Sequence, residues 1–114
     1  MTAKNEKMIL EREEASLKIT KTINGNNLKV ALEGRLDTGT APELEKELKN
    51  SLDGVEELEI DMEKLDYLSS AGLRVLLGAQ KTMNKQGSMK VSHVNATIME
   101  IFEVTGFSDI LTVV

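Results

Sequence analysis

The chain has 114 residues, and its 14 lysines and arginines against 19 aspartates and glutamates give a formal net charge of −5. An acidic surface repels nucleic acid and anionic membranes, and two phenylalanines, one tyrosine and no tryptophan leave few side chains on which bases could stack. No cysteine is present for disulfides, thiolate nucleophiles or metal sites, and no apolar run approaches the roughly 20 residues that span a membrane. We therefore expect one cytoplasmic domain that binds neither nucleic acid nor membrane.

Residues 1–15 are highly charged, with lysines and an arginine interleaved among glutamates around Met8-Ile9-Leu10. This composition fits a frayed tail, a short helix or an added first strand, and the pattern leaves all three open. We expect residues 1–15 to form a charged tail or added element and residues 16–114 to form the folded domain.

From Ser16 onward, apolar residues recur at every second position, which is typical of strands with one buried face. Segments 17–23 and 28–32 both show this pattern, and the residues 24–27 between them tolerate positive φ. The sequence therefore predicts a β-hairpin. Its apolar positions are Leu17, Ile19, Ile23, Leu28, Val30 and Leu32.

A third strand is predicted over residues 57–62, which are apolar on one face and acidic on the other. A parallel sheet covered on both faces would show nearly continuous apolar runs. We therefore expect helices on one face only, with the opposite face at least partly wet. The acidic face could attract a basic partner, although alternating carboxylates are also typical of a solvated strand.

The first helix is predicted to begin after Thr40, because residues 40–43 combine a threonine N-cap, a proline in the first turn and a glutamate at capping-box spacing. Its buried stripe is Leu44, Leu48 and Leu52, and Asp53-Gly54 ends it.

A second helix opens behind Ser69-Ser70 and stops at Gln86-Gly87. A strand over residues 88–94, a third helix from Asn95 to Gly106 and a terminal strand over residues 110–114 follow. This order predicts a mixed sheet with an antiparallel first hairpin and helical crossovers. The inward positions are Leu73, Leu76, Leu77, Met83, Ile98, Ile101 and Phe102, and the outward ones are Arg74, Lys81, Lys85, Glu100 and Glu103.

Catalytic motifs are not found. Gly72 and Gly78 have the wrong spacing for a phosphate loop, and the only histidine, His93, falls at an ordinary position of a predicted strand. The carboxylates follow helix-surface and strand-face spacings rather than a calcium-loop pattern. We expect no enzyme activity, no catalytic residue, no metal site and no cofactor, and only a deep pocket joining His93 to several carboxylates would favour an enzyme.

Ser70 is a candidate phosphorylation site. A hydroxyl at a helix N-terminus lies among unpaired backbone N–H groups at the positive end of the helix dipole, where a phosphate is accommodated without unfolding the helix. The simpler alternative is that Ser69-Ser70 only caps the helix.

Residues 66–77, together with Gly34-Arg35-Leu36-Asp37 and Val104-Thr105-Gly106-Phe107, resemble the STAS domains of bacterial anti-sigma factor antagonists. The resemblance extends over about residues 15–114. It implies a single α/β STAS-like domain, with a mixed β-sheet, an antiparallel N-terminal hairpin and helices packed mainly on one face.

In that family, the serine that follows an aspartate at the start of the second helix is phosphorylated by an anti-sigma factor that is itself a serine kinase. This position corresponds to Ser70, and Ser69 stands where the family often has aspartate. The resemblance implies an antagonist that binds the kinase when unphosphorylated, so that a sigma factor is freed, and that phosphorylation switches off. ATP and Mg²⁺ would belong to the kinase, a serine phosphatase would restore the active form, and the antagonist would be a monomer or weak dimer.

The resemblance also implies a partner-binding surface around Ser70. Asp37 matches an acidic residue of the loop near the phosphorylated serine, although Asp37-Thr38-Gly39 is equally typical of a turn. The predicted partner contacts are Asp37, Thr38, Ser69, Ser70, Ala71, Gly72 and Arg74. The alternative function is a constitutive STAS interaction or scaffold module of a transport-associated or stress-signalling assembly, in which the serines are not phosphorylated.

Overall fold

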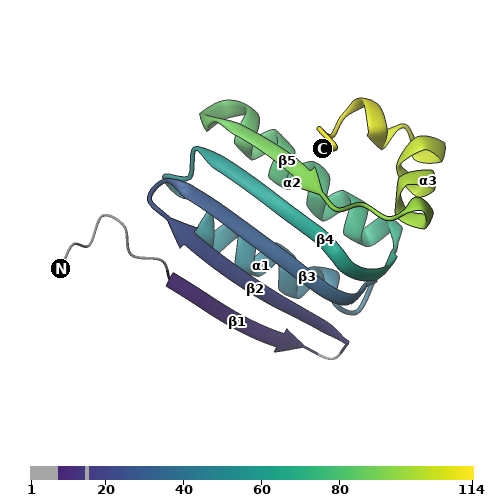
Figure 1. The fold of residues 1–114 in the computed structure, drawn as a ribbon, viewed down its shortest axis with the longest axis horizontal. Helices are drawn as coiled ribbons and strands as arrows, with labels where there is room; N and C mark the ends of the chain where they lie inside the picture. Colours follow the sequence, from purple (N-terminus) through teal and green to yellow (C-terminus); the bar gives the residue numbers. More distant parts are fainter. Residues whose placement is uncertain (1–7, 15) are drawn as a thin grey trace.

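The computed structural model describes residues 8–14 and 16–114, and side chains from residue 16 onward. These residues form a five-stranded sheet in the order β1-β2-β3-β4-β5, in which β1 to β3 are antiparallel and β4 and β5 run parallel to β3 (Figure 1). The strands are β1 (Met8–Glu14), β2 (Leu17–Asn24), β3 (Asn27–Leu36), β4 (Glu57–Leu68) and β5 (Ser88–Ser92), and the helices are α1 (Ala41–Ser51), α2 (Ser70–Gln86), α3 (Ala96–Thr105) and a 3₁₀ turn (Phe107–Asp109).

The predicted hairpin is confirmed as β2 and β3, which pair from Leu17↔Gly34 to Asn24↔Asn27. Gly25 in the turn has φ +65, which glycine adopts readily. Of the three possibilities for the N-terminal segment, residues 8–14 form a strand that pairs with β2 at the edge of the sheet. Residues 1–7 and 15 lie outside the described residues.

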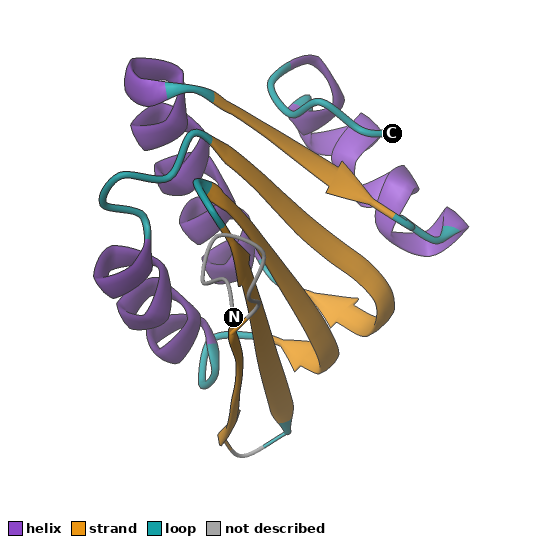
Figure 2. Ribbon diagram, turned by 60° about the vertical axis from the view of Figure 1, so that its left-hand side comes forward, coloured by secondary structure: helices purple, strands orange, loops and turns teal. Residues whose placement is uncertain are grey.

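Helices α1 and α2 cover one face of the sheet, as predicted (Figure 2). Parallel pairing of β3 with β4 and of β4 with β5 requires a crossover, and α1 and α2 supply the two connections. Alternate strand residues point to the helices and form the core. The fully buried residues include Leu17, Ile19, Leu32, Leu44, Ile60, Met62, Leu76 and Phe102.

The opposite side of the sheet, called here the open face, carries polar and charged side chains. Lys18 and Thr20 of β2, Lys29 of β3 and Glu57 and Glu59 of β4 alternate with the buried positions. The expectation that one face is at least partly wet is therefore confirmed for the described strands. The inward positions Leu77 and Ile101 are only half-buried.

A buried ion pair fastens α1 to the sheet. Lys21 is on the helix-covered face of β2, and its Nζ lies 2.8 Å from Glu47 Oε1, with side chains 12% and 6% exposed. Lys21 Nζ also donates to Ser51 Oγ at 3.0 Å. Paired charges can be buried where an unpaired one could not.

The predicted terminal strand over residues 110–114 is wrong. After Gly106 the chain makes the 3₁₀ turn, and only an isolated parallel bridge joins Val91 to Val113. Two backbone hydrogen bonds hold this bridge, from Val91 N–H to Thr112 O (2.8 Å) and from Val114 N–H to Val91 O (3.0 Å). Strand β5 also ends earlier than predicted, at Ser92, because His93 has φ +56, outside the strand region.

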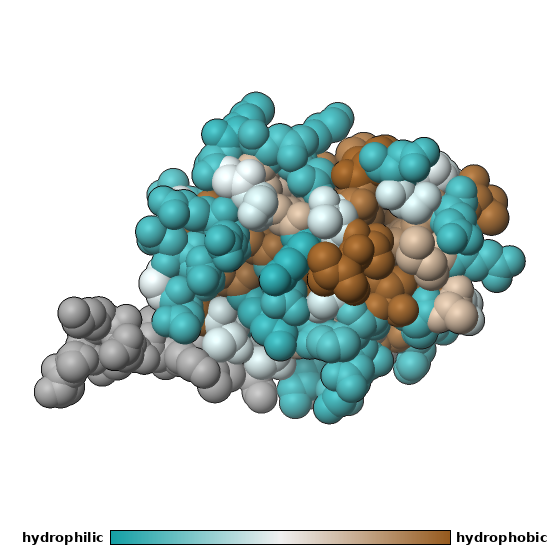
Figure 3. All heavy atoms as spheres, turned by 45° about the horizontal axis from the view of Figure 1, so that its top comes forward, coloured by the Kyte–Doolittle hydropathy of each residue, from teal (hydrophilic) through white to brown (hydrophobic). Residues whose placement is uncertain are grey.

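The face drawn in Figure 3 is largely hydrophilic, with one apolar area. Exposed large apolar side chains include Val104, Ile110 and Val114, at 80%, 47% and 66% exposure, all in the C-terminal part. Among the described helices, none combines the length and apolar character needed to cross a lipid bilayer.

Candidate functional site

The start of α2 is fixed by Ser69. Ser69 is the N-cap, with φ −99 and ψ 174, and its Oγ accepts a hydrogen bond from the Gly72 N–H at 3.4 Å. The Ser69 N–H donates to the carbonyl of Leu36 at 2.9 Å. The cap therefore also ties the beginning of α2 to the end of β3.

Ser70 is the first residue of α2 and is exposed. Its hydroxyl is presented at the positive end of the helix dipole, beside the unpaired N–H groups of the first turn. The capping role falls to Ser69, so Ser70 is not needed for it. The arrangement leaves the Ser70 hydroxyl accessible to a partner.

Gly72 allows α2 to approach the sheet closely. A Cβ at this position would lie 2.7 Å from Leu36 Cγ and 2.8 Å from Leu68 Cδ1. Gly72 is itself buried. Gly72 is therefore a packing residue: its lack of a side chain lets the first turn of α2 lie against the ends of β3 and β4.

Asp37 organises the loop between β3 and α1. Its Oδ1 accepts hydrogen bonds from the N–H groups of Gly39 (3.0 Å) and Thr40 (3.1 Å), and its Oδ2 lies 3.5 Å from Arg35 Nε. Burial raises the pKa of the Asp37 carboxyl, but the hydrogen bonds from Thr40 and Gly39 and the contact with Arg35 outweigh it and lower the pKa below its ordinary value. Asp37 thus has the turn role that the sequence allowed, as an ionised carboxylate.

The predicted capping box at α1 is wrong. Thr40 is the N-cap but makes no side-chain cap hydrogen bond. It is 1% exposed, and its hydroxyl instead accepts from the Asp37 N–H (2.9 Å) and donates to the Arg35 carbonyl (2.8 Å). The Ala41 N–H at the start of α1 donates to the Asp37 carbonyl (2.8 Å). Thr40 is turned inward because it closes the loop.

Arg35 and Tyr67 form a contact that the sequence did not predict. The Arg35 guanidinium lies 4.1 Å from the centre of the Tyr67 ring, a cation–π distance. The two residues pair across β3 and β4. Both lie in the segments that carry the family resemblance, and this is the only sequence signal that could have singled them out.

The fold brings Thr38, Ala71 and Arg74 together, since all three line one cavity of about 390 Å³. Ala41, Pro42 and Glu45 of α1 and Val75 of α2 also line this cavity. We call the group formed by Asp37, Thr38, Ser70, Ala71 and Arg74 the Ser70 surface.

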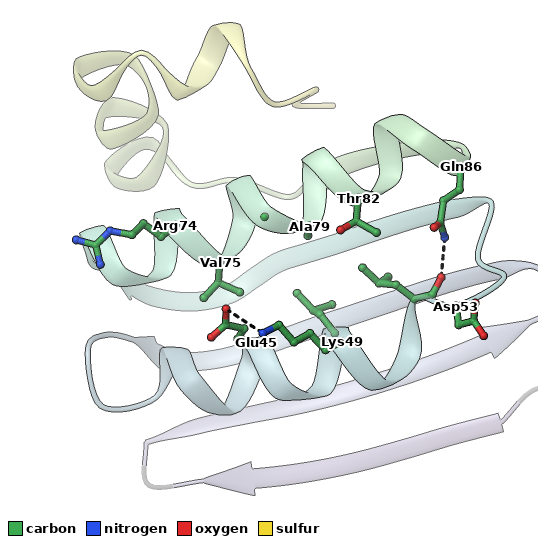
Figure 4. Close-up of a pocket in the computed structure, with 11 residues that line it drawn as sticks. Glu45, Lys49, Asp53, Arg74, Val75, Ala79, Thr82 and Gln86 are labelled. Atoms are coloured by element: carbon green, nitrogen blue, oxygen red, sulfur yellow. Dashed lines mark hydrogen bonds and ion pairs between the residues drawn. The ribbon is translucent and has the colours of Figure 1, made fainter.

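A groove of about 510 Å³ continues from this cavity between α1 and α2. The two hollows share Glu45, Arg74 and Val75, and Figure 4 shows Arg74 at one end of the groove and Gln86 near the other. Gln86 Nε2 donates to the carbonyls of Leu52 (2.6 Å) and Val55 (2.7 Å), which joins the C-terminal end of α2 to the segment after α1. The i, i+4 spacing of the α2 residues that face α1 is the signal that could have predicted this groove.

The fold is that of a STAS domain. The family model for the STAS domain matches residues 18–114, so the chain belongs to this family. Among curated proteins, it is similar to the anti-sigma-B factor antagonist of Bacillus subtilis, with 31% identity over 91 residues that cover 79% of this chain and 84% of the relative.

Solved structures share the fold. An anti-sigma factor antagonist from Mycobacterium paratuberculosis superimposes with a TM-score of 0.72 at 20% identity, covering 99% of this chain and 89% of that one. SpoIIAA in its unphosphorylated form gives a TM-score of 0.71 at 14% identity, covering 94% and 88%. The phosphorylated form of Bacillus SpoIIAA gives 0.65 at 14% identity, covering 94% and 91%.

Proposed function

We propose that this protein is an anti-sigma factor antagonist. In its unphosphorylated form it binds a kinase-type anti-sigma factor through the Ser70 surface and frees a sigma factor, and phosphorylation of Ser70 switches it off. The observation that carries this proposal is the exposed Ser70 at the first position of α2, beside a separate N-cap in Ser69. The curated relative of Bacillus subtilis is named for the same activity.

The chemistry of the switch follows from charge. A phosphoserine adds about −1.5 to −2 charges at pH 7. On Ser70 it would lie one helical turn from Arg74, close enough for the phosphate and the guanidinium to interact. The phosphate therefore both adds negative charge to the surface and competes for the one cation that α2 contributes to it.

The required energy is small. A 100-fold loss of affinity for the partner corresponds to about 2.7 kcal/mol, which a single misplaced charge at an interface can supply. The domain does not have to refold. SpoIIAA, which shares the fold, has been solved in unphosphorylated and phosphorylated forms, and this supports the proposed switch.

The partners follow from this role. The kinase would hold the ATP and Mg²⁺, a serine phosphatase would restore the binding-competent form, and the antagonist would act in the cytoplasm as a monomer or weak dimer. Ser69 replaces the aspartate that the family often has, and its cap hydrogen bond to Gly72 performs the structural part of that residue's task.

The test is phosphorylation by a kinase-type anti-sigma factor, sought first among the genes adjacent to this protein's gene. The protein is incubated with that kinase and ATP, and phosphate is mapped by mass spectrometry in wild type, Ser70→Ala and the neighbouring control Ser69→Ala. We expect labelling of wild type and of Ser69→Ala, and none of Ser70→Ala. Equal labelling of wild type and Ser70→Ala would remove Ser70 from the mechanism.

A constitutive STAS scaffold is the second candidate. It is favoured by the structural roles of Ser69 and Asp37, both of which are engaged in local hydrogen bonds. It predicts that Ser70→Asp and Ser70→Ala bind the partner equally well, whereas the antagonist predicts a difference of tenfold or more between them.

A further inference from the structure

Three side chains of types that can ligate a metal ion meet outside the residues of the Ser70 surface. Asp61 and Glu63 belong to β4, and His93 directly follows β5. One ligand atom from each lies within 4.8 Å of those of the other two. Asp61 and His93 are 32 positions apart in the chain, so this cluster depends on the fold.

Strand register brings these residues together. Asp61 pairs with Ser92 across β4 and β5, which puts His93 one residue beyond it. Strand β4 also has an irregularity, since Ala31 pairs with Asp61 while Glu33 pairs with Lys64, leaving an extra β4 residue. Such bulges redirect side chains, and here the Glu63 N–H donates to Asp61 Oδ1 at 3.0 Å.

The donor set has a chemical preference. An imidazole nitrogen with two carboxylates suits Zn²⁺ and related transition metals, whereas Mg²⁺ and Ca²⁺ prefer oxygen ligands alone. His93 Nδ1 is 3.0 Å from Asp61 Oδ1. Ligands of a tetrahedral Zn²⁺ at its usual bond lengths lie about 3.3 Å apart, so small side-chain rotations would close the three atoms around one ion.

We propose that Asp61, Glu63 and His93 bind one divalent transition-metal ion of the Zn²⁺ class, with solvent completing its coordination. Glu63 is exposed, and the His93 side chain is 55% exposed, so an ion can enter from solvent. Asp61 is the anchor, because its side chain is only 11% exposed and is already oriented by the Glu63 N–H.

The ammonium group of Lys29 would compete with a metal ion for the Asp61 carboxylate. Lys29 Nζ lies 3.4 Å from Asp61 Oδ2, and the Lys29 side chain is 46% exposed. The ammonium group neutralises the carboxylate when no ion is bound, and an incoming cation must displace or repel it. Removal of the Lys29 charge should therefore strengthen metal binding, whereas loss of a ligand should weaken it.

Titration calorimetry of the untagged full chain with ZnCl₂ tests the site. We expect one ion per chain with a dissociation constant on the order of micromolar, binding at least about tenfold weaker in His93→Ala and Glu63→Gln, and tighter binding in Lys29→Met. The matched control Glu57→Gln removes an exposed carboxylate from the same strand and should leave binding unchanged. MgCl₂ should give no saturable binding at the same concentrations.

Because His93 is the only histidine in the chain, its imidazole NMR signals report on this site alone. They should shift on addition of Zn²⁺ to wild type, and circular dichroism establishes that each variant is folded before titration. Absence of saturable Zn²⁺ binding in both wild type and Lys29→Met, or equal binding by wild type and His93→Ala, would overturn the proposal.

Discussion

The Ser69 N–H donates a 2.9 Å hydrogen bond to the Leu36 carbonyl, which joins the first turn of α2 to the last residue of β3. The residue after Ser69 is the exposed candidate for phosphorylation, and the residue after Leu36 is Asp37 of the β3–α1 loop. One backbone hydrogen bond thus holds the two halves of the Ser70 surface in register.

A negative charge at Ser70 should weaken partner binding. We expect Ser70→Asp to lower affinity for the anti-sigma factor about 100-fold, or about 2.7 kcal/mol, and Ser70→Ala to bind like wild type, as measured by titration calorimetry. The control is Ser88→Asp, which adds the same charge at an exposed serine beyond the opposite end of α2. Equal affinities of Ser70→Asp and Ser88→Asp would contradict the proposed mechanism.

Gly72 and Gly78 should respond to alanine in opposite directions. A Cβ at Gly72 would overlap Leu36 and Leu68, whereas one at Gly78 meets nothing within 4 Å. We expect Gly72→Ala to destabilise the fold by about 1–3 kcal/mol and Gly78→Ala, in the interior of α2, to stabilise it by about 0.5–1 kcal/mol. Urea denaturation measures both, and a Gly72→Ala variant as stable as wild type would contradict the predicted overlap with Leu36 and Leu68.

The Lys21–Glu47 pair should be strongly coupled. The Lys21→Met substitution removes a cation 2.8 Å from the buried Glu47 carboxylate, so we expect it to cost about 3 kcal/mol. The double variant Lys21→Met/Glu47→Leu should recover most of this loss, since two apolar groups need no partner. A double-mutant cycle by urea denaturation gives the coupling, and additive single effects would mean that the pair contributes little.

Stability should fall in acid partly through Asp61. Burial raises the pKa of this carboxyl, but the Glu63 N–H, the hydrogen bond and charge of His93 and the charge of Lys29 lower it overall. A group whose pKa is lower in the folded state stabilises the fold above its unfolded pKa, about 3.9, and this contribution is lost as pH falls through the folded value.

Asp61→Asn should therefore reduce the loss of stability below about pH 4. Urea denaturation midpoints are measured from about pH 2 to pH 6 for wild type, Asp61→Asn and a control, Asp66→Asn. The control removes the same charge from an exposed position elsewhere on β4. An Asp61→Asn profile parallel to that of wild type would argue against the pKa shift.

Local patterns predicted most of the fold. Alternation in β2 and β3, the leucine stripe of α1 and the Asn95 and Gly106 boundaries of α3 each depend on neighbours within a few residues. The terminal strand was mispredicted because Ile110 to Val114 has strand composition, and nothing local reveals that this segment follows a 3₁₀ turn and meets β5 at a single bridge.

Side-chain partners far apart in the chain were harder to predict. Lys21 interrupts an apolar stripe, and its position makes sense only once α1 brings Glu47 over β2. His93 was expected to be an ordinary strand residue because its relation to Asp61 depends on the β4–β5 register. For the Ser70 surface, the sequence indicated the residues through family resemblance, and the cavity joining Thr38 to Arg74 required the packing of α1 against α2.

Gly72 has a mechanical consequence for signalling. The side chains of Leu36 and Leu68 pack against the backbone of Gly72, so the first turn of α2 cannot move closer to the sheet. Because the helix cannot move closer to the sheet, a phosphate on Ser70 would have to project outward into solvent. A partner would then detect the modification only as a change of shape and charge on the surface of a domain whose backbone stays in place.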